Sequence, residues 1–167
     1  IKKYIDSLSK TVKSWYHISN IEKSEYGDDL KLWMRRLSRA GFAAFRPLMM
    51  AVMSKDEDEN KLEELIKKCE RFVFLVFRMS HRPTNTKNSH FYRLASDYYQ
   101  GRPFNGDKST TTNIDDIIGN IQWLTEGESG EGEEYKYHGW YDLDKFYDAI
   151  KDMFNKYNGF YSWYALK

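Results

Sequence analysis

Apolar residues recur at steps of three and four from about residue 59 to residue 80, and no other pattern constrains the fold of this chain as strongly. The period is held by Leu62, Leu65, Ile66, Cys69, Phe72, Val73, Val76 and Phe77. Such spacing places one apolar stripe along an α-helix. Between Phe72 and Phe77 the apolar residues cover nearly the whole circumference, which indicates a helix with neighbours on every side. The acidic run 56–59 suits the start of this helix, because negative charge is favourable at a helix N-terminus. The sequence therefore predicts a long central helix at about 59–80.

The same period predicts further helices before and after the central one. They lie at roughly 1–18, 28–41, within 42–53, around 91–98, at about 113–124 and at about 143–157. Their expected N-terminal caps are Asp28 or Asp29, Thr112 or Asn113, and Asp142. No alternating strand pattern of useful length and no internal repeat is found. We therefore predict an all-α fold: seven or eight helices in an irregular bundle around the central helix, forming a single domain over 1–167.

Large aromatic side chains are unusually frequent, at 17% of the chain. They include 13 Tyr, 10 Phe and 5 Trp. Rings in this number indicate a core or a partner surface built on large aromatic groups. One apolar face of the first predicted helix is made by Tyr4, Ile5, Leu8, Val12, Trp15 and Tyr16.

Two stretches fall outside the helical pattern. Residues 105–112 are predicted to form a polar loop, and the Gly- and Glu-rich residues 125–139 an exposed, mobile loop without core contacts. The chain begins at Ile1 and ends in an apolar pattern at 160–167. We interpret it as a fragment of a longer protein.

Composition and spacing argue against an active site. The single cysteine, Cys69, excludes an internal disulfide and a cysteine-cluster zinc site, fits a cytoplasmic location, and lies where a small buried apolar residue is expected. His17, His81, His90 and His138 lack partners at metal-ligand spacing. There is no Gly-rich phosphate loop, no nucleophile–base pair, and no apolar run near the ~18 residues that would span a membrane. We expect no catalytic residue, no metal and no cofactor in this chain.

Charge is segregated along the chain although the total is only +1. Residues 1–55 hold 11 Lys and Arg against 5 Asp and Glu, and residues 71–108 hold 7 against 2. Residues 109–167 hold 5 against 11, and residues 56–70 hold 3 against 7. A fold that brings the two basic segments together would have a basic face and an acidic face.

Basic residues in those two segments are the candidates for binding nucleic acid. On the second predicted helix and just after it the candidates are Arg35, Arg36, Arg39 and Arg46; around the break after the central helix they are Arg78, Arg82 and Asn85. Each group has an ordinary alternative. The first group also fits a solvated helix face, and the second fits helix capping and pairing with acidic residues such as Asp97. If functional, they would contact phosphates in a salt-sensitive, sequence-independent way.

Several short motifs also resemble a known family. Phe45-Arg46-Pro47-Leu48 precedes a charged loop, and the long helix that follows ends in Phe74-Leu75-Val76-Phe77-Arg78. A polar turn with Thr84-Asn85 comes next, and an aromatic stretch, 160–164, lies near the C-terminus. Together these motifs resemble the helical middle region of GmrSD-like, modification-dependent restriction proteins, in which a ParB-like nuclease domain is joined to an HNH endonuclease domain. The resemblance covers about half of the chain.

The resemblance implies a non-catalytic helical connector of a bacterial defence endonuclease. Its partners would be the flanking nuclease domains of the same chain and the backbone of foreign DNA. The catalytic motifs of the family lie outside this sequence, so the resemblance carries over no catalytic residue. A second hypothesis, drawn from the aromatic content, is a protein-interaction or oligomerisation module with no role in binding nucleic acid.

Overall fold

The computed structural model describes residues 1–41, 43–55, 58–104, 111–127 and 139–156, with only the backbone given for 153–156. It is 79% helical, with seven α-helices and no strand among the described residues, which confirms the predicted all-α fold. The α-helices are α1 (Lys2–Ser19), α2 (Asp28–Gly41), α3 (Arg46–Met53), α4 (Glu59–Phe72), α5 (Asn88–Gln100), α6 (Ile114–Glu126) and α7 (Leu143–Lys156). Two short 3₁₀ helices, η1 (Ile21–Lys23) and η2 (Ala43–Phe45), precede α2 and α3.

The predicted central helix is real, but it changes its winding halfway. Helix α4 continues without a break into a π-helix, η3 (Val73–Met79). A π-helix has a wider turn than an α-helix, with i→i+5 hydrogen bonds. The Ser80 amide and the Ser80 hydroxyl both donate to the carbonyl of Leu75, at 3.0 and 2.8 Å. Five of the seven side chains of η3 are buried, in agreement with the nearly all-round apolar sequence of this segment.

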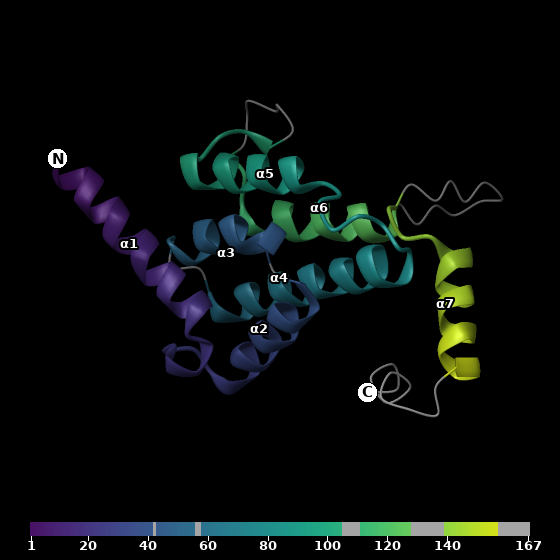
Figure 1. Cartoon of the computed structure of the whole chain (residues 1–167). Coiled ribbons are helices and arrows are strands. Elements are labelled where there is room, and N and C mark those ends of the chain that lie inside the picture. Colours follow the sequence, from purple (N-terminus) through teal and green to yellow (C-terminus); the bar gives the residue numbers. More distant parts are fainter. Residues whose placement is uncertain (42, 56–57, 105–110, 128–138, 157–167) are drawn as a thin grey trace.

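Helices α2 and α6 pack on α4 from opposite sides, and α3 and α5 pack on each other next to it (Figure 1). Four phenylalanines from four elements meet where these helices converge. The ring centroid of Phe72 lies 5.8 Å from Phe45, 5.2 Å from Phe91 and 5.4 Å from Phe77, each pair close to edge-to-face. Aromatic pairs prefer this arrangement, and each contributes about 0.5–1.5 kcal/mol beyond the burial of its area. Phe72 is fully buried and holds the centre of the core.

Helix ends follow local sequence signals. Asp58 caps α4 by accepting from the Asn60 amide, and Asn113 forms a capping box with Asp116 at the start of α6. Gly101 ends α5 in the left-handed conformation, at φ 65°. Of the two aspartates expected to cap α2, Asp28 is already the first helical residue, so both lie in the first turn of the helix.

The loop predicted at 125–139 begins later than the sequence suggested. Helix α6 runs to Glu126, and Thr125 is buried with its hydroxyl donating to the Ile121 carbonyl at 2.7 Å. The predicted loop therefore starts after α6, because Thr125 completes the last helical turn instead of leaving it. The rest of that loop (128–138), most of the polar loop expected at 105–112 (105–110) and the C-terminal 157–167 lie outside the described residues.

Helices α1 and α7 lie at opposite ends of the molecule (Figure 1). Helix α7 is joined to the core at its start, where the Asp142 amide donates to the Ser80 hydroxyl at 2.8 Å and Asp142 caps the helix through the Lys145 amide at 3.1 Å. Trp140 just before it is half-buried against the core. Among the described elements, the rest of α7 packs mainly on η3. Its Tyr147 side chain is 61% exposed.

The position of Phe72 predicts a large effect of its truncation. Phe72→Ala is expected to lower the free energy of unfolding by about 3–5 kcal/mol, because the cavity lies where four rings meet and cannot collapse. Phe74→Ala is the matched control: the same change two residues away, at a half-buried position, should cost less than half as much. Urea unfolding followed by circular dichroism measures both. Equal losses would show that Phe72 has no special place in the core.

Candidate interaction surfaces

Helix α1 rests on the rest of the molecule through its smaller and more polar side. Its buried residues are Ser14, His17 and Ile18, and Ser7 and Thr11 are half-buried. This side packs on α3. The helix is therefore docked through few large apolar contacts, and its apolar face packs little on the rest of the described chain.

A small set of polar and ring contacts fixes the docking of α1. The His17 ring packs on Tyr26, 5.3 Å between centroids, and its Nε2 lies 3.7 Å from Glu25 Oε1. Lys13 Nζ lies 3.0 Å from the same oxygen, and its hydrogen bond lowers the pKa of Glu25 below the usual value. Closer to the N-terminus the hydroxyls of Ser7 and Tyr99 are in contact. These contacts link α1 to the segment before α2 and to α5.

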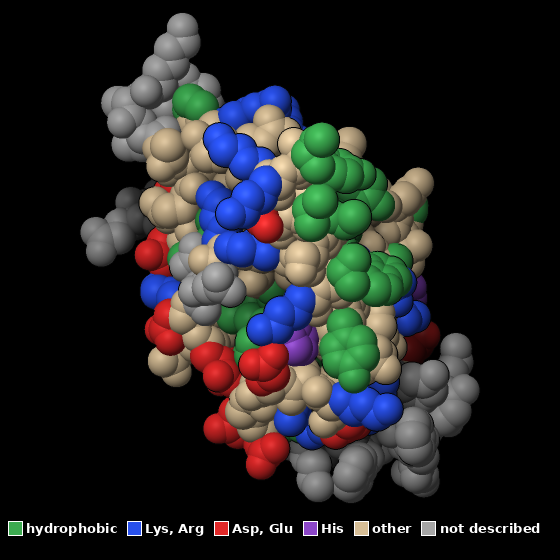
Figure 2. Space-filling view, turned by 90° about the vertical axis from the view of Figure 1, so that its left-hand side faces the viewer, with side chains coloured by type: hydrophobic (Ala, Val, Ile, Leu, Met, Phe, Trp, Pro, Cys, Tyr) green, Lys and Arg blue, Asp and Glu red, His purple; other side chains and the backbone are tan. Residues whose placement is uncertain are grey.

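The apolar face of α1 points into solvent. We call Tyr4, Ile5, Leu8, Val12, Trp15 and Tyr16 the apolar band; their exposed fractions run from 44% to 72%. With 3.6 residues per turn, the six fall within about 120° of the helix circumference. Figure 2, which faces this end of the molecule, shows hydrophobic side chains gathered in a broad band. The sequence pattern identified this face correctly as one face of a helix, but the face takes no part in the core.

The apolar band is large for an exposed surface. With about 150–250 Å² for each aromatic side chain and somewhat less for each aliphatic one, the exposed fractions leave roughly 450–700 Å² of apolar area in water. The largest apolar patch of a typical monomer is about 300–600 Å² and is often functional. One side of a standard protein–protein interface buries about 800 Å². The apolar band alone thus supplies more than half of the area that one side of such an interface buries.

Lysines border the apolar band on its solvent side. Of the four exposed lysines of α1, Lys2 and Lys13 lie next to the band on the helix circumference, and Lys13 is paired there with Glu25. Figure 2 shows Lys and Arg side chains gathered beside the hydrophobic band. On the other edge, the guanidinium carbon of Arg46 lies 5.5 Å from the Trp15 ring centroid. The surroundings of the apolar band are therefore basic on both sides.

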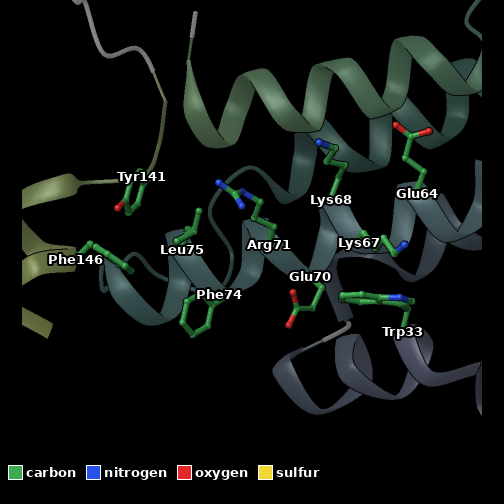
Figure 3. A pocket seen from close by; sticks show the side chains of 10 residues that line it. All are labelled: Trp33, Glu64, Lys67, Lys68, Glu70, Arg71, Phe74, Leu75, Tyr141 and Phe146. Atoms are coloured by element: carbon green, nitrogen blue, oxygen red, sulfur yellow. The ribbon is translucent and has the colours of Figure 1, made fainter. Parts of the chain in front are cut away.

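A second surface feature is an open groove of about 660 Å³ beside α4 and η3 (Figure 3). Trp33 of α2 lies at one end, Tyr141 and Phe146 at the other, and Phe74 and Leu75 of η3 between them. The charged side chains that line it are Glu64, Lys67, Lys68, Glu70 and Arg71.

Charged groups around this groove already have partners in the protein. Arg36 and Lys67 lie 4.5 and 5.2 Å from the Trp33 ring centroid, and Arg71 Nε pairs with Glu126 at 2.6 Å. Partial burial raises the pKa of Glu70 and outweighs the opposing effect of nearby Arg36. The groove is lined by aromatic rings and by charges of both signs, several of them paired, and no nucleophile lies beside a base among its lining residues.

The structure brings two of the candidate nucleic-acid residues to one place. Arg78 of η3 donates to the Ala40 carbonyl at the end of α2, at 3.0 Å, so it caps that helix next to the turn that carries Arg39. Arg39 and Arg78 are both exposed. This contact joins the two basic segments, 1–55 and 71–108, at the C-terminal end of α2.

The other candidates are distributed over separate contacts. Arg35 pairs with Glu22 at 2.8 Å, Arg36 packs on Trp33, and Arg46 packs on Trp15 of α1. Arg82 lies 5.4 Å from the Trp140 ring centroid, near Lys87 at 4.8 Å from the same ring. Asn85 is exposed in the turn before α5. Asp97, which the sequence suggested as a partner for this second group, pairs instead with Arg102 at 3.5 Å.

Nothing in the described part of the chain has the make-up of a metal site, since no three His, Cys, Asp or Glu side chains converge there. Cys69 is fully buried, and burial raises the pKa of its thiol, in line with the predicted role as a small apolar residue. None of the helices described is both long enough and apolar enough to cross a bilayer.

Comparison of the chain with protein-family models, with curated proteins and with solved structures finds no match.

The exposure of the apolar band predicts that it adds little to stability. Leu8→Ala is expected to change the free energy of unfolding by no more than about 0.5 kcal/mol, because Leu8 is half in water. Leu37→Ala on α2, the same change at a fully buried position, should cost about 2–5 kcal/mol. Urea unfolding of both variants decides the matter. A large loss at Leu8 would mean that α1 buries this face in solution.

Proposed function

We propose that this chain is a protein-interaction domain that binds its partner through the apolar band of α1. A single observation carries the proposal: six large apolar side chains on one helix face the solvent, while the same helix meets its own core with serine, threonine, histidine and a single isoleucine, Ile18. Exposing roughly 450–700 Å² of apolar surface has a cost of about 25 cal/mol per Å² relative to covering it. Covering it is therefore the largest gain in free energy that this surface offers.

The helical scaffold fits this role. An interface side chain gains most when it is held in place before binding, because less conformational entropy is then lost. Helix α1 is fixed by His17, by the ion pair of Lys13 with Glu25 and by Ile18, none of which belongs to the apolar band. The band is thus presented on an ordered helix.

Site-specific photo-crosslinking in the source cells tests the proposal. A benzophenone amino acid in place of Tyr16, at the edge of the apolar band, is expected to form a protein adduct on irradiation, because a partner covers that position. The matched control places the same amino acid at Gln122, an exposed position on α6. Adding Val12→Asp to the Tyr16 variant should abolish the adduct. A Tyr16 position that stays free of adducts would contradict the proposal.

A second candidate is the DNA-contacting connector of a restriction-type endonuclease that the sequence resemblance implied. It is favoured by the hydrogen bond from Arg78 to the Ala40 carbonyl, which joins the two basic segments at the end of α2. Phosphate contacts from such arginines would carry no base information and would weaken steeply with salt.

This second candidate predicts weak, non-specific binding of the purified domain to duplex DNA. Affinity should fall by orders of magnitude between low and physiological salt, and the triple reversal Arg35→Glu, Arg36→Glu and Arg39→Glu should weaken binding to all sequences alike. The triple reversal Lys2→Glu, Lys3→Glu and Lys10→Glu on α1, all at exposed positions, serves as the charge-matched control. A labelled duplex in a salt titration, beside a nuclease assay with magnesium and manganese, provides the measurement. No binding even at low salt would remove this candidate, and metal-dependent cleavage would refute a non-catalytic connector.

A further inference from the structure

The apolar band has the spacing of a helix–helix seam. Ile5, Leu8, Val12 and Trp15 follow one another at steps of three, four and three, which are the a and d positions of a heptad. β-branched residues stand at both a positions and leucine at the first d position. All four side chains are about half exposed. From Tyr4 to Tyr16 the seam extends over about 18 Å, slightly more than three helical turns.

The shape of the surface also points to a helix as the occupant. An α-helix is a convex ridge, so a second helix can lay its own apolar stripe along it with ridges in grooves. Helix α1 already contacts α3 on its other side, which leaves the heptad side open along its length. The covering element therefore runs along α1 and needs an apolar stripe of similar length.

The charges at the edges of the apolar band determine which residues can flank the apolar stripe of the covering helix. The solvent-side edge of the apolar band has Lys2, and also Lys13, which is paired with Glu25 at 3.0 Å. The opposite edge has Arg46 beside Trp15, and the only acidic residue of α1 itself is Asp6. A second copy of α1 would bring like charges together, which disfavours self-pairing. Opposite charges beside an apolar seam select partners and speed their association.

We infer that the partner presents an amphipathic helix whose apolar stripe is flanked by Asp and Glu. This inference rests on the proposed function and adds to it the chemistry of the partner. The seam supplies the contact area, and the surrounding lysines and Arg46 select the acidic flanks.

Two designed peptides test the charge selection directly. Both are 21-residue helices with leucine at heptad positions a and d; one has glutamate at every e and g position, and the other has lysine there. The glutamate peptide is expected to bind the domain roughly tenfold or more tightly than the lysine peptide at low salt, and the difference should shrink in 1 M salt. Fluorescence anisotropy of labelled peptide gives both dissociation constants.

Variants place the binding on α1. Val12→Asp should abolish binding of the glutamate peptide, whereas Tyr147→Asp, an equally apolar exposed position on α7, should leave it unchanged. The double reversal Lys2→Glu and Arg46→Glu, one on each edge of the apolar band, should shift the preference toward the lysine peptide. Circular dichroism and urea unfolding verify that each variant is folded, so that a loss of binding is not a loss of structure.

Each contrary outcome has a distinct meaning. Equal binding of the two peptides, or binding of neither, would overturn the acidic partner. Sedimentation could instead show that the domain dimerises through the apolar band and that Val12→Asp restores the monomer. In that case the occupant of the band would be a second copy of this chain and not an acidic partner helix. The peptide experiments test the charge of the partner, whereas photo-crosslinking at Tyr16 tests whether any protein covers the apolar band. The proposed function can therefore be contradicted or supported independently of this inference.

Discussion

The edge-to-face contacts of Phe72 with Phe45, Phe77 and Phe91 are the constraint on which the other packing depends. They join η2, α4, η3 and α5 at the point where the α-helix widens into a π-helix. The extra residue in each hydrogen-bonded loop rotates η3 relative to α4 and places the Ser80 hydroxyl where it accepts a hydrogen bond from the Asp142 amide. Through this one serine, the winding of the central helix also determines where α7 begins.

A core completed by α2 to α6 leaves the two outermost helices with apolar surface in solvent. Helix α1 meets the body with small and polar residues, and α7 is anchored mainly at its first turn. Amphipathic helices gain most of their stability by burying their apolar face. The free energy available from covering α1 is therefore not used within the described chain, and it supplies a driving force for association.

The arginines show how the same side chain can serve stability and recognition. Arg78 satisfies a carbonyl at the end of α2, and Arg35, Arg36, Arg46 and Arg82 lie against an acidic or aromatic neighbour. An exposed ion pair such as Arg35 with Glu22, or an exposed cation–π contact, contributes about 1 kcal/mol or less, so breaking one to reach a phosphate would cost little. The apolar band has no such internal partner for most of its area, and this asymmetry is why protein binding ranks above DNA binding here.

The sequence by itself determined the all-α fold, the central helix, the caps at Asn113 and Asp142, and the helical face formed by Tyr4 to Tyr16, since all of these depend on spacing and local hydrogen bonds within a few residues. Which way that face points was decided only by the tertiary structure. An amphipathic pattern shows that a helix has an apolar side, but it does not say whether the core has room for it. Here Phe45, Phe72, Phe91 and the aliphatic residues of α2 to α6 already fill the core, and the contacts of His17 and Ser14 turn α1 so that its apolar band faces outward. The meeting of Arg78 with Ala40, 38 residues apart, is tertiary in the same sense, because no local rule relates the end of one helix to a side chain of another.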